Sequence, residues 1–598
     1  MKDAPAIVVL TAGALATAQR AAAAVDGEIH GLARRVDGAP VSFERVAPHL
    51  QQLFRDGRPI VGLCAAGVLI RALAADLSDK TNEPPVLAVA EDGSAVIPLL
   101  GGHHGGNRLA RRIAAALGVE AAITTASDLR FDIALDEPPD GYTLVNPEDL
   151  KDFTAKLLAG GRVRLVGRAP WLYDGGLPLD DEGTLTIGVD EQVAAAGPDT
   201  LHYHPRTLAV GVGCERGAEP SEVLDLVGSC LDDAGLDRSA VALVTSLDLK
   251  MDEPAVNALA AGLGVPSRFF PAARLEDETP RLANPSELVF REVGCHGVAE
   301  GAALAAVGEG GQLLVAKRKS ARATCAIARA PAPLAATEIG IGRGRLAVVG
   351  IGPGRADWRT PEAGELIASA EDVVGYGLYL DLLGPGPADQ RRHAFDLGAE
   401  TERVRAALEL AAEGRRVALV SSGDAGIYAM ATLVFELLDR EGREDWRRLE
   451  VVVAPGISAL QAVAARAGAP LGHDFCTISL SDLLTPWPVI EKRIEAAARG
   501  DFVIAFYNPA SRQRTTQLAR AMELLGRHRG PDTVVVLGRN MGRGGEDLRI
   551  TDLAHFDPCT VDMLTLVMIG ATETRALRRT DGGTWAYTPR GYGTGDKG

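Results

Sequence analysis

A glycine-rich turn after an apolar run is the first feature of this sequence with the makings of a chemical site. The stretch LAVVGIGPGRAD (346–357) places Gly350, Gly352, Pro353 and Gly354 directly after a predicted strand. A strand that ends in glycines exposes backbone N–H and C=O groups without side chains, so a flat cofactor can lie against the main chain. Similar turns follow strands in many unrelated α/β proteins, so the surrounding segments must decide its meaning.

Five later segments repeat the layout of a strand followed by a polar turn. Each is a β-branched run that ends in small or polar residues, and most then enter a helical pattern: RVALVSSGDAGIYAMATLVFELL (416–438), VVVAPGISALQAVAARAGAPL (451–471), DFCTISLSDLLTPW (474–487), DFVIAFYNPASRQRT (501–515) and TVVVLGRNMGRGGEDLRITDL (533–553). This layout is typical of a mostly parallel sheet whose loops gather at its carboxyl edge. The sequence therefore predicts an α/β fold with a cofactor cleft at that edge.

These motifs make residues 345–580 similar to the tetrapyrrole (uroporphyrin-III C/corrin) methylases, and within them to the precorrin-3B C17-methyltransferases of cobalamin biosynthesis. The resemblance rests on GIGPG, SSGDAGIYAM, CTISLSDLLTPWPVIEKRIEAAARGDFVIAFYNP and LGRNMGR. It implies a two-lobed fold, a homodimer, and S-adenosylmethionine bound in the cleft between the lobes. The cofactor-binding residues that it implies are Gly350, Gly352, Pro353, Gly354, Ser422, Gly423, Asp424, Ala425, Gly426, Ile427, Tyr428, Ser481, Asp482, Tyr507, Asn508 and Pro509.

Several of these side chains have a second interpretation. Asp424 is either an Asx-turn residue or a direct cofactor contact, and both roles are compatible. Tyr428 and Tyr507 are either cofactor contacts or aromatic residues at the edge of the core. Four arginines follow strand ends that should border the cleft: Arg512, Arg514, Arg539 and Arg543. Guanidinium groups match the geometry of carboxylates, so we expect these arginines to contact the substrate rather than to form a solvated face.

Methyl transfer itself requires alignment and exclusion of water rather than a strong base. In the family resembled, C17 methylation is accompanied by ring contraction, which implies a general base near the macrocycle. The candidates are Asp482, Asp424, Glu546 and His473, and the sequence does not rank them.

The first 330 residues carry a separate group of motifs. IVGLCAAGVLIRALAADLSDK (60–80), PPVLAVAEDGSAVIPLLGGHHGGNRLARRIAAALG (84–118), LAVGVGCERGAEPSEVLDLV (208–227), VALVTSLDLKMDEPAVNALAAGLG (241–264) and GCHGVAEGAALAAVG (294–308) resemble the cobalt-precorrin-5A hydrolase family. The resemblance covers an N-terminal domain (1–135) and a C-terminal domain (206–330). It implies opening of a δ-lactone with release of acetaldehyde, which requires an activated water, an oxyanion stabiliser and an acid/base group.

Two places in this half are candidate catalytic sites. GGHHGGN (101–107) precedes a helical pattern, so free N–H groups at a helix start predict an anion site beside His103 or His104. We favour His103 as the base, and the alternative is a pair of structural loop histidines. By pattern Asp248 and Lys250 lie two apart at a strand end and point the same way, where they share a proton, hold a carboxylate or form a solvated ion pair. GVGCERG (211–217) and Gly297–Glu300 are also expected at strand ends.

Composition excludes several functional classes. The 598 residues are 46% hydrophobic and 24% charged. The sequence contains no apolar run of the roughly 20 residues that span a bilayer and no basic stretch at the N-terminus. We therefore expect a cytoplasmic multidomain enzyme. The net charge of −17 argues against nucleic acid and anionic membranes as partners, and a carboxylate-rich corrinoid would need a local basic pocket. Seven scattered cysteines and irregularly spaced histidines predict reduced thiols and no metal site, so cobalt would belong to the substrate.

The expected organisation is α/β and multidomain. A proline- and alanine-rich stretch at 331–344 predicts a linker between the hydrolase-like half (1–135, a middle segment 136–205, and 206–330) and the methylase domain (345–580), with a tail at 581–598. The interpretation is a bifunctional enzyme of corrin biosynthesis. There are two alternatives. In one, the methylase acts at another corrin position, and in the other the N-terminal half is non-catalytic, binds corrinoid and passes it to the methylase. The methylase motifs are common to the metal-free and the cobalt-loaded routes, so this choice stays open.

Overall fold

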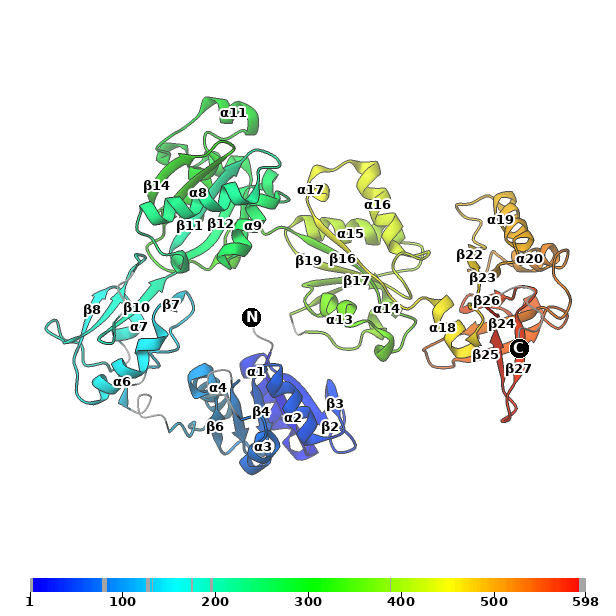
Figure 1. Ribbon diagram of the computed structural model, residues 1–598, viewed down its shortest axis with the longest axis horizontal. Helices are drawn as coiled ribbons and strands as arrows, with labels where there is room; N and C mark the ends of the chain where they lie inside the picture. The colour runs from blue at the N-terminus through cyan, green and yellow to red at the C-terminus, as the bar shows by residue number, and fades with distance from the viewer. Residues whose placement is uncertain are drawn as a thin grey trace. The chain divides into compact units, whose positions relative to one another are not determined.

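The chain forms two compact units of α/β architecture. The computed structural model describes residues 4–77, 83–124, 130–131, 133–173, 176–193, 197–387 and 389–590. The units are Met1–Gly340 and Ile341–Gly598, and each contains more than one sheet flanked by helices (Figure 1). The expected multidomain α/β class is therefore confirmed. Among the described residues, no helix combines the length and the apolar composition that a membrane crossing requires.

The first sheet of unit Met1–Gly340 has the order β3-β2-β1-β4-β5-β6, in which only β6 is antiparallel to its neighbour. Its elements are β1 (Ala6–Val9), α1 (Leu15–Val25), β2 (Glu28–Leu32), β3 (Val41–Phe43), α2 (Val46–Arg55), β4 (Ile60–Leu63), α3 (Ala66–Leu73), β5 (Val86–Val89), β6 (Val96–Leu100), the 3-10 turn η2 (Gly102–His104) and α4 (Gly106–Leu117). Alternation along β1 sends Ile7 and Val9 to the core under α1 and α4. Ala6 and Val8 contribute to the core on the other side, under α2 and α3.

A smaller mixed sheet follows, with the order β7-β10-β9-β8. It comprises β7 (Tyr142–Leu144), α6 (Leu150–Leu158), β8 (Val163–Gly167), α7 (Pro170–Tyr173), β9 (Leu185–Val189) and β10 (Thr200–Pro205). Strands β8, β9 and β10 are parallel, while β7 pairs antiparallel with β10. Phe153 from α6 and Tyr203 from β10 are fully buried in its core.

The third sheet has the order β13-β12-β11-β15-β14. Its elements are β11 (Leu208–Cys214), α8 (Pro220–Asp233), β12 (Val241–Leu247), the 3-10 turn η5 (Asp248–Lys250), α9 (Pro254–Leu263), β13 (Ser267–Phe270), α10 (Ala272–Glu276), α11 (Glu287–Val293), α12 (Val298–Val307), β14 (Gln312–Lys319) and β15 (Ala323–Arg329). Helices α8 and α9 cover one face, and α10 and α12 cover the other. Gly211 of β11 lets α12 approach, because a Cβ there would overlap the carbonyl oxygen of Ala299.

The expectation that Gly297–Glu300 ends a strand is wrong. Gly297 is the N-cap of α12, and Glu300 lies inside that helix with 1% of its surface exposed. The Glu300 carboxylate accepts hydrogen bonds from the Asn284 side chain at 2.9 Å and from the Lys317 backbone at 2.7 Å. The alanine- and glycine-rich sequence that was expected at a strand end instead forms a buried helix, because small residues let its backbone pack against β11.

The first sheet of unit Ile341–Gly598 is fully parallel, with the order β18-β17-β19-β16-β20. Its elements are β16 (Arg345–Gly350), α13 (Pro361–Ala368), β17 (Asp372–Tyr376), α14 (Gly377–Leu382), β18 (Arg391–Phe395), α15 (Glu400–Ala412), β19 (Arg416–Ser421), α16 (Met430–Glu441), α17 (Glu444–Arg447) and β20 (Glu450–Ala454). Strands β19, β16 and β20 are neighbours, so the loops after them meet at one edge.

The second lobe carries a mixed sheet, β22-β23-β26-β24-β25, and a small sheet, β21-β28-β27. Its elements are α18 (Ala459–Ala467), β21 (Gly468–Ala469), β22 (Phe475–Ser479), α19 (Trp487–Arg499), β23 (Val503–Tyr507), α20 (Gln517–Leu525), β24 (Val534–Arg539), β25 (Asp547–Asp552), β26 (Thr565–Ile569), β27 (Arg575–Arg578) and β28 (Thr584–Tyr587). In the mixed sheet only β22 and β23 run parallel, so the expected mostly parallel sheet is wrong for this lobe. The loop between β24 and β25 has no crossover helix, and such a short connection reverses the strand.

Much of the predicted linker is attached to the first unit. Leu334, Ala336 and Ile339 pack against the hydrophobic core beside α12. The Arg268 guanidinium donates to the carbonyl oxygens of Ile339 at 2.5 Å and Gly340 at 2.8 Å. The two units therefore separate after Gly340.

Candidate functional site

Three loops at the carboxyl edge of the parallel sheet meet backbone to backbone. Gly352 and Gly423 exchange hydrogen bonds, with N–H to O distances of 3.1 Å and 2.8 Å. A Cβ added to Gly350 would lie 2.6 Å from the Gly423 oxygen and 2.9 Å from the Gly456 nitrogen. The close approach of the loops after β16, β19 and β20 therefore requires a glycine at residue 350.

The glycines of the GIGPG turn face protein rather than open space. Gly352 has a φ of +73°, and a Cβ there would lie 2.9 Å from the Trp358 oxygen. A Cβ on Gly354 would lie 2.5 Å from Cγ of Arg543. The structure uses these positions for the turn and for loop packing. The expected contact of their backbone with a cofactor stays a prediction. Pro353 is the residue of this turn that lines the neighbouring cavity.

That cavity has a volume of about 500 Å³ and lies within the unit Ile341–Gly598. Its size is within the range of small-molecule sites, about 300–1,000 Å³. The residues predicted to bind cofactor or substrate that line it are Pro353, Ser422, Gly423, Asp424, Ile427, Tyr428, Tyr507, Asn508 and Arg543. The predicted residues outside its lining are Gly350, Gly352, Gly354, Ala425, Gly426, Ser481, Asp482, Pro509, Arg512, Arg514 and Arg539.

Asp424 connects two of the loops. Its Oδ1 accepts a hydrogen bond from the Gly426 backbone at 2.8 Å, which is the Asx-turn arrangement. Its Oδ2 accepts from the Gly456 backbone at 3.1 Å. The Asx-turn interpretation of Asp424 is thus seen directly, and the same side chain lies at the cavity wall.

Two tyrosines connect the lobes beside the cavity. Tyr428 has a positive φ of 51° and donates its hydroxyl to the Thr477 carbonyl oxygen at 3.0 Å. The centroid of its ring lies 5.1 Å from that of Tyr507. The Tyr507 hydroxyl accepts a hydrogen bond from the Leu460 backbone at 3.1 Å, and burial raises its pKa, so this phenol stays neutral. The pair holds α18 and β22 against the loop after β19.

The predicted substrate arginines mostly bind the protein itself. Arg514 is buried and donates to the Asn508 carbonyl oxygen and the Ser481 hydroxyl, both at 3.0 Å. Arg543 donates to the Pro353 carbonyl oxygen at 2.6 Å and to the Ser422 hydroxyl at 2.7 Å. Of the remaining two, Arg539 forms an ion pair with Asp562 at 2.7 Å and Arg512 is exposed.

A fifth arginine, which sequence reasoning missed, lines the cavity. Arg403 of α15 is only 3% exposed, and its guanidinium donates to the Asp396 carbonyl oxygen at 2.9 Å. Its Nε is buried without a hydrogen-bond partner among the described residues. The available signal was its place in the helix: Arg403, Ala407 and Ala411 form one buried stripe at four-residue spacing. A basic residue on such a stripe requires an anionic or polar partner.

The four candidate bases differ in position. Asp424 lines the cavity, and Asp482, Glu546 and His473 do not. Glu546 accepts hydrogen bonds from the Gly542 backbone at 2.8 Å and from Arg466 at 2.9 Å, which lower the pKa of its carboxyl group. Asp482 accepts from Gln517 at 2.8 Å, which lowers its pKa as well.

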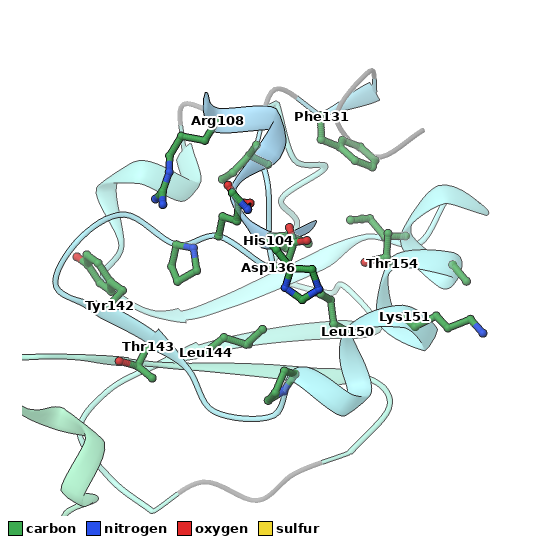
Figure 2. Close-up of a pocket in the computed structure, with 18 of the residues that line it drawn as sticks. His104, Arg108, Phe131, Asp136, Tyr142, Thr143, Leu144, Leu150, Lys151 and Thr154 are labelled. Atoms are coloured by element: carbon green, nitrogen blue, oxygen red, sulfur yellow. The ribbon is translucent and has the colours of Figure 1, made fainter. Parts of the chain in front are cut away.

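In the first unit, GGHHGGN forms the turn before α4 as expected. Gly105 has a φ of +95°, and its N–H donates to the Glu137 carboxylate, so an anionic group of this chain occupies the helix start. His104 is exposed and lines a cavity of about 1,050 Å³ together with residues from 131–144 and α6 (Figure 2). The side chain of His103, which we favoured as base, lies outside the described residues.

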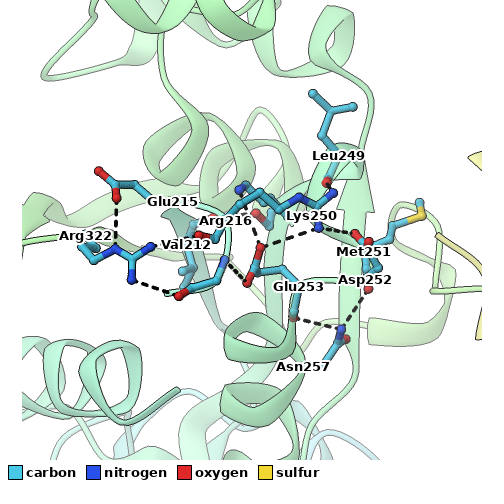
Figure 3. Close-up of polar contacts among 12 residues, drawn as sticks. Val212, Glu215, Arg216, Leu249, Lys250, Met251, Asp252, Glu253, Asn257 and Arg322 are labelled. Atoms are coloured by element: carbon cyan, nitrogen blue, oxygen red, sulfur yellow. Dashed lines mark hydrogen bonds and ion pairs between the residues drawn. The ribbon is translucent and has the colours of Figure 1, made fainter. Parts of the chain in front are cut away.

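Lys250 belongs to a polar cluster after β11 and β12 (Figure 3). The expectation that Asp248 and Lys250 point the same way from a strand end is wrong, because both lie in η5, where residues two apart face different directions. The Lys250 ammonium lies 3.8 Å from the fully buried Glu253 carboxylate. Glu253 also accepts a hydrogen bond from the Gly217 backbone at 3.0 Å and lies 3.6 Å from Arg216. GVGCERG follows β11 as expected.

Comparison with known families divides the chain as the fold does. Residues 48–128 match the family model described as Cobalamin synthesis G N-terminal. Residues 208–328 match Cobalamin synthesis G C-terminus. Residues 345–557 match Tetrapyrrole (Corrin/Porphyrin) Methylases.

Individual proteins are similar over about two fifths of the chain. A protein of Sinorhizobium sp named precorrin-3B C(17)-methyltransferase is 47% identical over 249 residues, which are 42% of this chain and 97% of that protein. A Salmonella typhimurium protein named probable cobalt-factor III C(17)-methyltransferase is 48% identical over 247 residues, 41% of this chain and 99% of that protein. The crystal structure of the methyltransferase CobJ is 43% identical, covers 41% of this chain and 100% of its own, and has a TM-score of 0.39.

Proposed function

Because the chain belongs to the tetrapyrrole methylase family, we propose that its second unit transfers a methyl group from S-adenosylmethionine to C17 of precorrin-3B or its cobalt form. The observation that carries the proposal is the cavity of about 500 Å³, since the loop 421–430 that contains SSGDAGIYAM forms much of its wall. The likeness to proteins named for C17 methylation supports the choice of position on the ring.

The residues at the cavity suit such a ligand. At Gly423 a Cβ would meet nothing closer than 3.8 Å, so the backbone of this residue borders free space, unlike Gly350. S-adenosylmethionine, when bound, would supply a methyl group on a sulfonium; a nucleophilic carbon can accept that methyl group while the sulfur leaves as a neutral thioether, so the transfer needs no strong base. Ser422 and Asp424 offer oxygen atoms at the cavity wall. Tyr428 and Tyr507 limit the entry of water on the side of the cavity that faces the second lobe. Their task is alignment and exclusion of water.

We assign recognition of the corrinoid's carboxylates to Arg403. Its buried Nε–H, which has no partner among the described residues, would donate a charge-assisted hydrogen bond to a substrate carboxylate. Of the four candidate bases, we place the proton acceptor for ring contraction at Asp424, because it is the one that reaches the cavity. The homodimer and the cytoplasmic location remain proposals that rest on the family.

A pair of leucine substitutions on α18 tests the cavity as the cofactor site. Ala459 lines it in the first turn of the helix, whereas Ala465 of the same helix is exposed. Ala459→Leu should weaken S-adenosylmethionine binding, measured by calorimetry, and slow methylation of precorrin-3B, followed by mass spectrometry. Ala465→Leu should change neither. Equal affinity in the two variants would mean that the cofactor binds elsewhere.

For the first unit we propose lactone opening on the methylated product, in line with its match to both Cobalamin synthesis G models. His104 is the described histidine at the cavity of about 1,050 Å³, and with His103 it is the candidate base. Loss of a general base costs on the order of 100- to 10,000-fold in rate. We would measure this loss as the single-turnover rate of acetaldehyde release by His103→Ala and His104→Ala. His555→Ala, at an exposed residue of the other unit, is the control.

One observation favours the second possibility, a non-catalytic corrinoid-binding half. The Gly105 N–H is bonded to Glu137, and the Lys250 ammonium is paired with Glu253, so both predicted polar groups already have partners within the chain. Such a half would bind the methylase product without consuming it. Acetaldehyde release at the parental rate by both histidine variants would exclude these two residues as the base. No release by the parent would favour the binding role.

A further inference from the structure

Three metal-ligating side chains converge beside the mixed sheet β7-β10-β9-β8. They are Asp190, His202 and His204, and one ligand atom of each lies within 4.8 Å of the others. His202 and His204 are two apart on β10 and so share a face of the strand. Asp190 follows β9, the parallel neighbour in which Val189 is paired with Tyr203. The histidine spacing alone did not indicate a metal, because the third ligand comes from another strand.

The short polar contacts around His204 need one more hydrogen than the neutral side chains supply. Its Nε2 lies 2.9 Å from the Gln192 carbonyl oxygen, and its Nδ1 lies 2.6 Å from the Ser239 hydroxyl. That hydroxyl lies 2.8 Å from Oδ1 of Asp237. A neutral imidazole and a serine hydroxyl supply two hydrogens for these three short contacts, since carbonyl and carboxylate oxygens only accept. The remaining contact needs either a second ring proton or a cation.

A cation bound at Nε2 of His204 would supply what is missing. If Nδ1–H donates to Ser239, and Ser239 donates to Asp237, the lone pair of Nε2 faces the lone pairs of the Gln192 oxygen. Nearby, Nε2 of His202 lies 3.2 Å from Oδ1 of Asp190. Ligand atoms at the zinc distance of about 2.0–2.1 Å lie about 3.0–3.4 Å apart, depending on the ligand angle. The separations of 2.9 and 3.2 Å are close to this range.

We propose that Asp190, His202 and His204, with the carbonyl oxygen of Gln192, bind one divalent metal ion of the zinc class. Ser239 and Asp237 act as positioning residues that fix the ring of His204, as outer hydrogen bonds do in metal sites. Both histidine side chains are buried, at 10% and 0% exposure, while the Asp190 side chain is 41% exposed and leaves a path for the ion.

Four protein ligands make a closed, structural site. The ion would fix the turn 190–193 against 235–239, where Val193 already donates to the Gly235 carbonyl oxygen at 3.0 Å and Asp237 to the Glu191 carbonyl oxygen at 2.8 Å. It would thus join the sheet β7-β10-β9-β8 to the sheet that begins at β11. This role is independent of the cobalt that a corrinoid substrate would carry.

The test uses full-length protein that has been stripped by a chelator and dialysed. Titration with Zn²⁺ in a calorimeter should give one tight site, and Co²⁺ should give the visible bands of low-coordinate cobalt. Asp190→Asn keeps the shape of an exposed side chain and should weaken Zn²⁺ binding at least about tenfold, as should His202→Gln. Ser239→Ala should weaken it about 10- to 100-fold if it positions His204.

His296→Gln is the matched control. His296 forms another histidine–carboxylate pair, 2.9 Å from Glu276, outside the proposed site, so its loss should leave the tight site unchanged. Zn²⁺ should also raise the thermal stability of the parent and not that of Asp190→Asn. Absence of a tight site in the parent, as expected if a second proton completes the network of His204, would overturn the proposal. So would equal Zn²⁺ affinity in the parent and Asp190→Asn.

Discussion

A single methyl group at residue 350 should loosen the loops that form the methylase cavity. Gly350 ends β16 without a positive φ, so Gly350→Ala tests close packing alone. The new Cβ would lie 2.6 Å from the Gly423 oxygen and 2.9 Å from the Gly456 nitrogen. Both are backbone atoms and cannot turn away as a flexible side chain would. Overpacking of this kind costs typically about 1–3 kcal/mol.

The cost should appear in cofactor binding, because Gly423 belongs to the cavity wall. A loss of about 1.4 kcal/mol raises a dissociation constant tenfold, so we expect a rise of about 5- to 150-fold for S-adenosylmethionine in calorimetry. Hydrogen exchange in peptides from β16 and β19 should become faster. Gly364→Ala is the matched control: it lies in α13 with nothing within 4 Å of the new Cβ, and it should stabilise the helix by about 0.5–1 kcal/mol. Parental affinity and exchange in Gly350→Ala would refute the packing argument.

Three further outcomes are expected. Arg403→Met should raise the KM for the corrinoid about 10- to 150-fold, because a charge-assisted hydrogen bond of about 1.5–3 kcal/mol is lost. Arg405→Met on the same helix is the control: it removes an ion pair with Glu441 and should leave the KM unchanged. The hydrogen bond from His30, assisted by Arg58, lowers the pKa of Glu28 from 4.5 to about 2. This carboxylate therefore stabilises the fold above pH 4.5, and its contribution is lost as the pH falls towards 2. The difference in the free energy of unfolding between the parent and Glu28→Gln, measured by denaturant titration, should shrink over that range. A fragment of residues 341–598 should fold and methylate by itself, and an insoluble or inactive fragment would show that the two units depend on each other.

The sequence predicted which segments form the site better than it predicted what each residue does there. Strand-end motifs located the cavity loops, because apolar β-branched runs and glycine turns are local signals. At Gly350 and Gly354 the same pattern suggested contact with a ligand, and the structure shows that protein atoms occupy the space into which a side chain would project. A glycine shows that something approaches closely, and the sequence does not say whether that is a ligand or another loop.

Tertiary contacts explain the other differences. The sequence did not indicate the partners of Arg514, which are Ser481 and the Asn508 carbonyl oxygen, because they are set by the fold. The antiparallel order of the second lobe followed from connection lengths that the strand patterns do not contain. Asp190 joins His202 only through the pairing of β9 with β10, which no spacing along the chain reveals.

The net charge of the chain increases the importance of Arg403 as a fixed cation at the cavity wall. The chain has a net charge of −17, so a substrate rich in carboxylates is repelled at long range. At physiological ionic strength this repulsion is screened beyond about 8 Å, and recognition then depends on fixed cations at the cavity wall. Arg543 lies there but already donates to Pro353 and Ser422. Arg403 combines burial with a free Nε, and a buried donor gains most from an anionic partner, since leaving it unpaired costs about 1–3 kcal/mol or more.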